Sequence, residues 1–70
     1  MSSFALNRLK IVLAERGITN RQLAQALGKA ESTVSQWCTN AKQPSLETFF
    51  KIAQFVDIDI RELIVKSKQG

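Results

Sequence analysis

Apolar residues recur every three or four positions along most of the chain, which is the spacing of one face of an α-helix. Two runs show this best, and we expect their members to face inward: Ala5, Leu6, Leu9, Val12 and Leu13, then Leu46, Phe49, Ile52, Ala53 and Val56. No segment alternates apolar and polar residues for long enough to predict a strand. The pattern predicts an all-α fold with five helices, over about residues 4–16, 20–27, 31–39, 45–56 and 60–66.

Start and stop signals stand at the ends of these predicted helices. Thr19 is followed three residues later by Gln22, which is the spacing of a capping box. Gly28 and Asn40 follow the second and third predicted helices, where a left-handed residue commonly ends a helix. Ser45 is a preferred N-cap residue for the fourth. The second helix is too short to be stable alone, so we expect packing to stabilise it.

A chain of 70 residues forms one domain at most, and it folds alone only if nearly all of its apolar residues reach the core. We expect a single domain over 1–70, with a folded core over about 4–66 and a frayed tail at 67–70. The apolar class makes up 44% of the residues, as in ordinary globular proteins. The chain has neither an apolar run of membrane-spanning length nor a signal-peptide pattern, so we expect it to be cytoplasmic.

The residue types that carry most enzyme chemistry are scarce. The chain has no histidine and a single cysteine, Cys38, which excludes an internal disulfide, a zinc site and a histidine-based nucleophile. We interpret Cys38 as a small buried apolar residue, with a redox switch as the alternative. The sequence therefore predicts a protein that is not an enzyme, with no metal and no other cofactor. Because 70 residues leave no room for an effector-binding domain, we also expect no small-molecule effector.

Positive charge is concentrated in the first part of the chain. The net charge is +4, and residues 1–30 carry five basic residues against Glu15 alone. A basic domain of this size favours polyanionic partners, chiefly nucleic acid. The alternative is ordinary surface charge. Net charge alone therefore distinguishes a nucleic-acid-binding protein from any other small basic protein only weakly.

Two short predicted helices meet across Gly28, Lys29 and Ala30, which is the pattern of a helix-turn-helix. The second of them presents short hydrogen-bonding side chains on its outer face. Glutamine can bind the edge of adenine, and serine or threonine can bind several bases. The flanks carry cationic or amide side chains suited to DNA phosphates: Asn20, Arg21, Lys29, Lys42 and Gln43.

Residues 5–65 resemble the lambda repressor-like DNA-binding domain of the Cro/repressor, or XRE, type. The resemblance is carried by the segments 18–24 (ITNRQLA), 27–28 (LG), 32–37 (STVSQW), 44–47 (PSLE), 52–53 (IA) and 58–63 (IDIREL). It implies a compact five-helix domain whose third helix enters the major groove. It also implies a twofold dimer on a pseudo-palindromic operator in double-stranded DNA, with half-sites one helical turn, about 34 Å, apart.

The resemblance assigns roles to particular positions. The candidates for reading bases are Glu31, Ser32, Thr33 and Gln36, and those for contacting phosphates are Thr19, Asn20, Arg21, Lys29, Ser35, Asn40, Lys42 and Gln43. Simpler interpretations stay open for several of them. Gln36 is also explained as a solvated residue, Thr33 as a cover of the apolar seam and Glu31 as a charge that favours a helix start. Arg21 and Lys29 are also explained as surface charge.

Aromatic residues supply candidates for the core and for a dimer interface. Trp37 lies three residues after Val34, which indicates a core residue rather than a base-stacking one. Phe49, Phe50 and Phe55 cannot all point inward, and Phe50 is expected to cover a loop or to join a dimer interface. The full set of dimer-interface candidates is Phe50, Phe55, Ile60 and Val65.

The chain departs from the pattern of the family in three respects. Many relatives pair an arginine on the first helix with a glutamate that ends the third, and Leu13 and Cys38 stand there instead. We expect an apolar contact to replace that ion pair. Ala30 replaces the usual Ser or Thr cap of the third helix, at a cost of about 1 kcal/mol. The base-reading face has no Arg or Lys, so the strongest readout of guanine is absent from this helix.

The sequence thus predicts a sequence-specific, homodimeric DNA-binding regulator of repressor type that acts by occupying an operator. Domains of this kind resemble phage regulators, restriction-modification controllers and antitoxins. The alternative is a protein-interaction module that uses the helix-turn-helix as a scaffold. Salt-dependent DNA affinity discriminates between the two, because only polyanion binding releases counterions.

Overall fold

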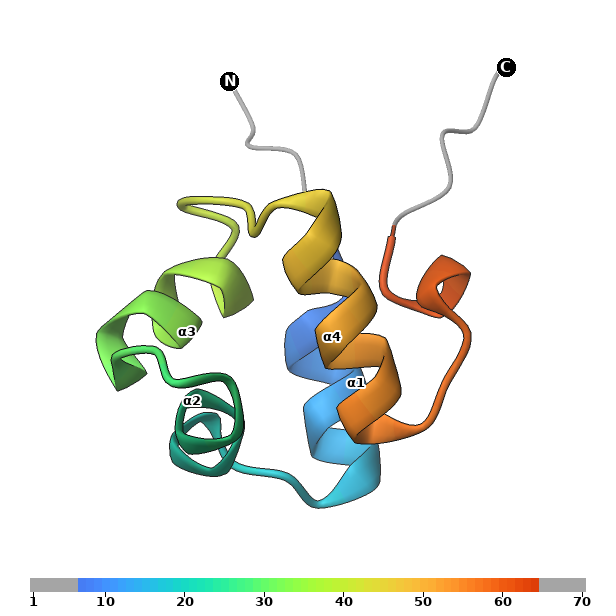
Figure 1. Ribbon diagram of the computed structural model, residues 1–70, viewed down its shortest axis with the longest axis horizontal. Coiled ribbons are helices and arrows are strands. Elements are labelled where there is room, and N and C mark those ends of the chain that lie inside the picture. Colours follow the sequence, from blue (N-terminus) through green and yellow to red (C-terminus); the bar gives the residue numbers. More distant parts are fainter. Residues whose placement is uncertain (1–6, 65–70) are drawn as a thin grey trace.

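The computed structural model describes residues 7–64, which form four α-helices and one short 3-10 helix (Figure 1). The elements are α1 (Leu9–Arg16), α2 (Asn20–Leu27), α3 (Glu31–Cys38), α4 (Leu46–Val56) and η1 (Ile60–Glu62). In this part of the chain, β pairing is limited to one isolated antiparallel bridge, between Asn7 and Ile64. The all-helical class is confirmed, whereas the prediction of five α-helices is wrong.

Both terminal helices are shorter than the sequence predicted. The first was expected from residue 4, yet Asn7 and Arg8 precede α1, and the N–H of Arg8 donates to the carbonyl of Leu63 at 2.7 Å. The last was expected over 60–66, yet helical structure ends at Glu62 and Ile64 forms the bridge. Pairing between these two segments satisfies backbone groups that a longer helix would have used. Residues 4–6 and 65–70, with the frayed tail, lie outside the described residues.

The three middle helices lie within one residue of their predicted bounds, and their caps have the expected geometry. The Thr19 hydroxyl accepts the N–H of Gln22 at 3.0 Å, and the Gln22 side chain accepts the N–H of Thr19 at 2.8 Å. Gly28 ends α2 at φ 68, a left-handed conformation that favours glycine. Ser45 caps α4 by accepting the N–H of Thr48 at 3.1 Å. The capping box and both caps are therefore confirmed.

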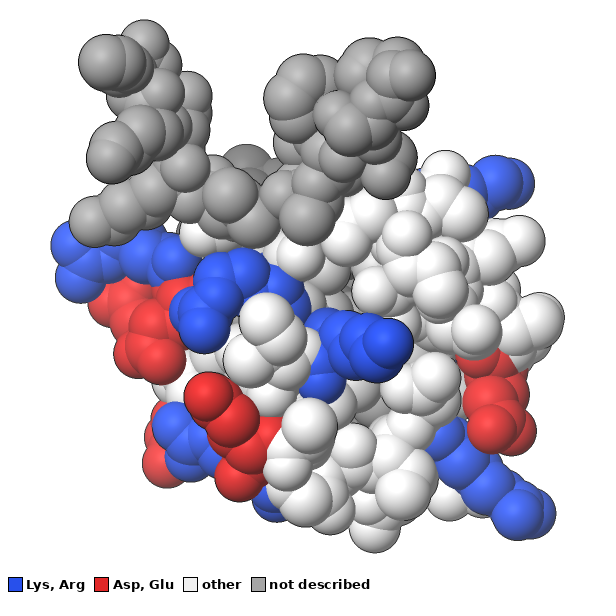
Figure 2. All heavy atoms as spheres, turned by 180° about the vertical axis from the view of Figure 1, so that it is seen from behind, with Lys and Arg blue, Asp and Glu red and all other residues white. Residues whose placement is uncertain are grey.

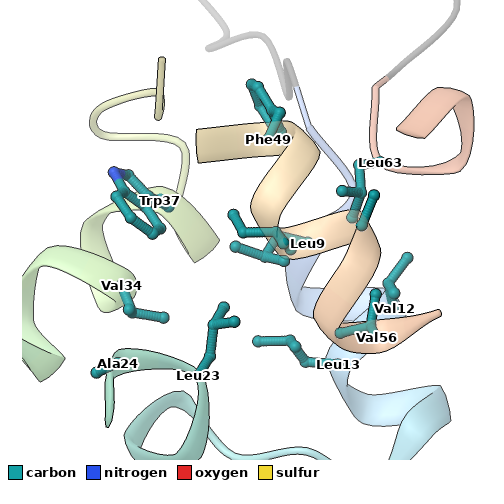
Figure 3. Packing of buried hydrophobic residues seen from close by; sticks show 12 residues of the cluster. Leu9, Val12, Leu13, Leu23, Ala24, Val34, Trp37, Phe49, Val56 and Leu63 are labelled. Atoms are coloured by element: carbon teal, nitrogen blue, oxygen red, sulfur yellow. The ribbon is translucent and has the colours of Figure 1, made fainter. Parts of the chain in front are cut away.

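The core lies between α1, α2, α3 and α4 and is closed by the C-terminal segment (Figure 3). Each α-helix contributes one fully buried side chain, and the residue after η1 contributes a fifth: Leu9, Leu23, Val34, Ile52 and Leu63. Trp37 is 6% exposed, which confirms it as a core residue. Leu46 was expected to face inward but is 64% exposed, because it starts α4 one turn before Phe49, the first residue of that helix to reach the core. No helix within 7–64 combines the length and apolarity that crossing a membrane requires.

The start of α3 lacks a side-chain cap, since Ala30 occupies the N-cap position. We expect Ala30→Ser to raise the free energy of unfolding by about 1 kcal/mol, because the hydroxyl would accept a first-turn N–H. Urea unfolding followed by Trp37 fluorescence measures the change. Ala26→Ser is the matched control, because it adds the same hydroxyl at an exposed position inside α2 where no cap forms. Equal stability of Ala30→Ser and the wild type would contradict the prediction.

Asp59 caps η1 and pairs with Arg61, whose Nη2 lies 3.0 Å from Oδ2. The hydrogen bond from the Arg61 side chain, with that from its backbone, lowers the pKa of Asp59 from 3.8 to about 2. Because the folded-state pKa is the lower one, this contribution to stability is present above about pH 4 and is lost as the pH falls toward 2. An NMR titration of the carboxyl should give a midpoint near pH 2, which Arg61→Gln raises toward 3.8 while Lys51→Gln leaves it in place. A wild-type midpoint near 3.8 would refute the pairing in solution.

Candidate nucleic-acid interface

The helix-turn-helix consists of α2 and α3, which pack directly on each other across the turn 28–30. Leu23 and Ala24 of α2 face Val34 and Trp37 of α3, and all four side chains are buried (Figure 3). This packing buries the side of α3 that carries Val34 and Trp37. The opposite side of α3 carries exposed residues.

The outer side of α3 gathers the four base-reading candidates on one helix. Glu31, Ser32 and Gln36 are exposed, while Thr33 is half-buried at the edge of the core. The half-buried position of Thr33 fits a residue that covers the edge of the core as well as one that contacts a base. Ser35, a phosphate candidate, is exposed on the same outer side.

The chemistry of this surface is polar with little charge. One carboxylate, one amide and several hydroxyls line α3, and the helix has no Lys or Arg. On the face that Figure 2 draws, more of the visible charged side chains lie over the half away from α2 and α3 than beside these two helices, where fewer basic and acidic side chains stand among uncharged ones. A surface of this kind matches base edges by hydrogen bonding rather than by charge.

The start of α2 forms the second part of the site. Thr19 is its N-cap residue, Asn20 is half-buried and Arg21 is exposed. The first N–H groups of a helix have no intrahelical acceptor and carry partial positive charge, so this end attracts an anion. The guanidinium of Arg21 adds a full positive charge beside it.

Cys38 contacts the start of α2. Its Sγ lies 3.5 Å from Oδ1 of Asn20, and burial raises the pKa of the thiol against the opposing effect of Lys10. The thiol therefore stays protonated at neutral pH and donates to Oδ1, which turns the amide NH₂ of Asn20 away from it. Leu13 is buried, whereas Cys38, expected to be buried, is half-buried and packs against the core. The hydrogen bond to Asn20 was not predicted.

The loop after α3 carries three of the predicted phosphate contacts, and two of them have structural partners. The Asn40 side chain accepts the N–H of Asn7 at 3.0 Å, and Gln43 Oε1 accepts from Asn7 Nδ2 at 2.8 Å. The Lys42 side chain belongs to an exposed residue of this loop. The three candidates therefore differ in role. Lys42 is an exposed cation, whereas Asn40 and Gln43 hold the loop to the domain through Asn7.

Sequence reasoning missed Asn7, which is 4% exposed. The available signal was a single Asn within an apolar run, since this residue favours helix starts and turns over helix interiors. Its partners in the loop lie more than thirty positions away in the sequence, with Gln43 at a separation of 36. No local pattern reveals such a pairing.

The dimer-interface candidates are spread over the surface. Phe50 is 53% and Phe55 is 44% exposed, while Ile60 is half-buried against the core. Phe50 and Phe55 lie about 140° apart around α4, because they are five positions apart. Leu46, which sequence reasoning had placed in the core, shares the side of Phe50. Val65 lies outside the described residues.

Ligands for a metal ion do not cluster within residues 7–64, where no group of three or more His, Cys, Asp or Glu side chains could hold one. All buried side-chain nitrogen and oxygen atoms in this part of the chain have hydrogen-bond partners.

Comparisons with known proteins agree with this geometry. The profile of a helix-turn-helix family matches residues 9–63. Two proteins named antitoxin HipB, from two strains of Escherichia coli, are 35% and 33% identical to this chain over 54 residues. Those matches cover 77% of this chain but 57% and 61% of the relatives, so the chain spans about three fifths of their length.

A solved structure shows the same fold at higher similarity. It is the crystal structure of a protein from Bacteroides fragilis that is described as DNA-binding. The two chains are 52% identical and superpose with a TM-score of 0.85 over 86% of this chain and 97% of the other. The arrangement of the helices is therefore that of an experimentally observed domain.

Proposed function

Because this chain belongs to the helix-turn-helix family of the Cro/repressor (XRE) type, a DNA-binding fold, we propose that it is a sequence-specific transcriptional repressor. It acts in the cytoplasm as a homodimer that occupies a pseudo-palindromic operator. The observation that carries the proposal is the outer face of α3, where exposed hydrogen-bonding side chains stand on a helix fixed from behind by the core. Both the family and the antitoxin relatives indicate a regulator rather than an enzyme.

In this proposal α3 lies in the major groove and reads bases with Glu31, Ser32, Thr33 and Gln36. Gln36 is exposed on α3, and its amide can bind both N6 and N7 of adenine. Glu31 can accept from the N4 amino group of cytosine. With no Arg or Lys on α3, discrimination depends on these neutral contacts and on the single carboxylate.

Phosphate contacts flank the reading helix. The first N–H groups of α2, with Thr19, Asn20 and Arg21, bind one phosphate, and the Cys38 thiol orients the Asn20 amide. Lys29 in the turn and Ser35 on α3 contact the backbone nearby. On the other side the loop supplies Lys42, while Asn40 and Gln43 contribute by fixing its conformation.

Dimerisation buries the exposed apolar side chains of α4 and the segment that follows. Leu46 and Phe50 form one apolar surface, with exposed fractions of 64% and 53%. Phe55, Ile60 and Val65 are the further candidates. A twofold arrangement would place two copies of α3 about 34 Å apart, in successive major grooves.

A second candidate function is a protein-interaction module, in which a different protein covers the surface of Leu46 and Phe50. The exposure of these side chains and the relatives named antitoxins favour it. The polar outer face of α3 favours DNA, because a module of this kind has no need of it. The two functions are separated by measuring DNA affinity against salt, since counterion release accompanies only polyanion binding.

Selection of bound duplexes from a random pool at two salt concentrations tests the proposal. We expect enrichment of a pseudo-palindrome with half-sites about 10 bp apart, because two symmetry-related copies of α3 read it. Retention that depends on salt but enriches no sequence would contradict sequence-specific binding. Absence of retention at low salt would overturn the DNA-binding function and favour the protein-interaction module.

Gln36→Ala and Arg21→Ala should weaken binding in different ways. Loss of the Gln36 amide should reduce discrimination at one base pair by about 1–3 kcal/mol, because one base contact disappears. Loss of the Arg21 guanidinium should weaken binding to all sequences alike and reduce the salt slope by about one. Titrations of matched and single-mismatch operators measure both effects, and each variant serves as the control for the other. A uniform loss across sequences for Gln36→Ala would exclude a base-reading role.

A further inference from the structure

Asn7 is a buried polar residue whose side chain and backbone join three parts of the molecule. Its Oδ1 accepts the N–H of Leu9 at 2.9 Å and so caps the start of α1. Its Nδ2 donates to the carbonyl of Trp37 at 3.0 Å and to Oε1 of Gln43 at 2.8 Å. Both hydrogens and the carbonyl oxygen of one amide are therefore used at once, each toward a different segment.

The backbone of Asn7 binds the same loop. Its N–H donates to Oδ1 of Asn40 at 3.0 Å, and its carbonyl accepts from Nδ2 of Asn40 at 3.4 Å. Nε2 of Gln43 donates to the same Oδ1 of Asn40 at 3.1 Å, which closes the network. Asn7 thus binds the first and last residues of the loop 40–43.

The loop is also tied to the reading helix. The N–H groups of Ala41 and Lys42 donate to the carbonyl of Gln36 at 2.9 and 3.2 Å. Gln36 is the proposed adenine-reading residue, and Lys42 carries the exposed cation of the loop. The distance between a base contact and a phosphate contact is consequently set by a segment that Asn7 holds in place.

We propose that Asn7 is a positioning residue for DNA binding. It touches no DNA itself, and it fixes the Lys42 loop relative to the outer face of α3 so that base and phosphate contacts form together. This inference rests on the proposed DNA-binding function. Asparagine suits the role because it supplies an acceptor for α1 and two donors for α3 and the loop, whereas aspartate keeps the acceptor and lacks the donors.

The test compares Asn7→Asp and Gln43→Ala with Val56→Ala. The first two break the network, and Gln43→Ala does so from a half-buried residue whose loss the fold tolerates more easily than a change at Asn7. Val56 is a core residue of α4, so its truncation lowers stability without touching the network. Each variant is titrated with a random-sequence duplex of about two helical turns, at several salt concentrations and at a temperature where it is fully folded.

We expect Asn7→Asp and Gln43→Ala to bind about tenfold more weakly than the wild type and to show a salt slope reduced by about one, because the Lys42 contact with phosphate is lost. Val56→Ala should match the wild type in both quantities. Loss of stability alone changes the folded fraction but not the number of phosphates contacted, so the slope separates positioning from stability. An unchanged slope in both network variants would overturn the inference while the proposed function stands.

Hydrogen exchange gives an independent readout. The amides of Ala41 and Lys42 should exchange faster in Asn7→Asp, while the amide of Gln22 in the capping box keeps its protection. Equal protection in the variant and the wild type would show that Asn7 does not hold the loop, which overturns the inference. A wild-type protein that binds no duplex at low salt would overturn the proposed function and the DNA-binding role of Asn7 with it.

Discussion

Every part of the proposed interface depends on helices that are too short to exist alone. The helices α1, α2 and α3 have eight residues each, below the length at which isolated helices are stable in water. Their shared core therefore determines both their stability and their orientation (Figure 3). Since α3 gives Val34 and Trp37 to that core, the direction of its polar face follows directly from the packing of its apolar face. One face of α3 thus stabilises the fold, and the opposite face carries the proposed base contacts.

Polar contacts determine where the helices begin and end, which the apolar core alone does not determine. The start of α2 is fixed by the reciprocal bonds of Thr19 and Gln22, and the end of α3 by donors from the loop and from Asn7. These two ends flank the outer face of α3 and carry the proposed phosphate contacts. The structure thus has ordered polar groups at both edges of the outer face of α3. The start of α3 is the exception, because Ala30 supplies no cap there.

Sequence reasoning succeeded where the controlling contacts are local. The capping box, the left-handed Gly28 and the burial of Trp37 all follow from spacings of a few residues. It failed at the two ends of the domain, where pairing of Asn7 with Ile64 joins segments from opposite ends of the chain. The roles of Asn40 and Gln43 illustrate the same limit. Their amides suit phosphate in chemical type, yet a distant residue engages both of them, and only the three-dimensional arrangement reveals it.

The bridge between Asn7 and Ile64 also determines how the domain can be combined with other protein segments. Because these residues are neighbours, the chain enters and leaves the described domain at the same place. A short linker could join the two positions and new ends could be opened elsewhere, which is the geometry that tolerates circular permutation. An added domain on either side would likewise be anchored at one corner. The helix α3 lies in the middle of the sequence, so the chain can be extended at both ends without interrupting the segment proposed to contact DNA.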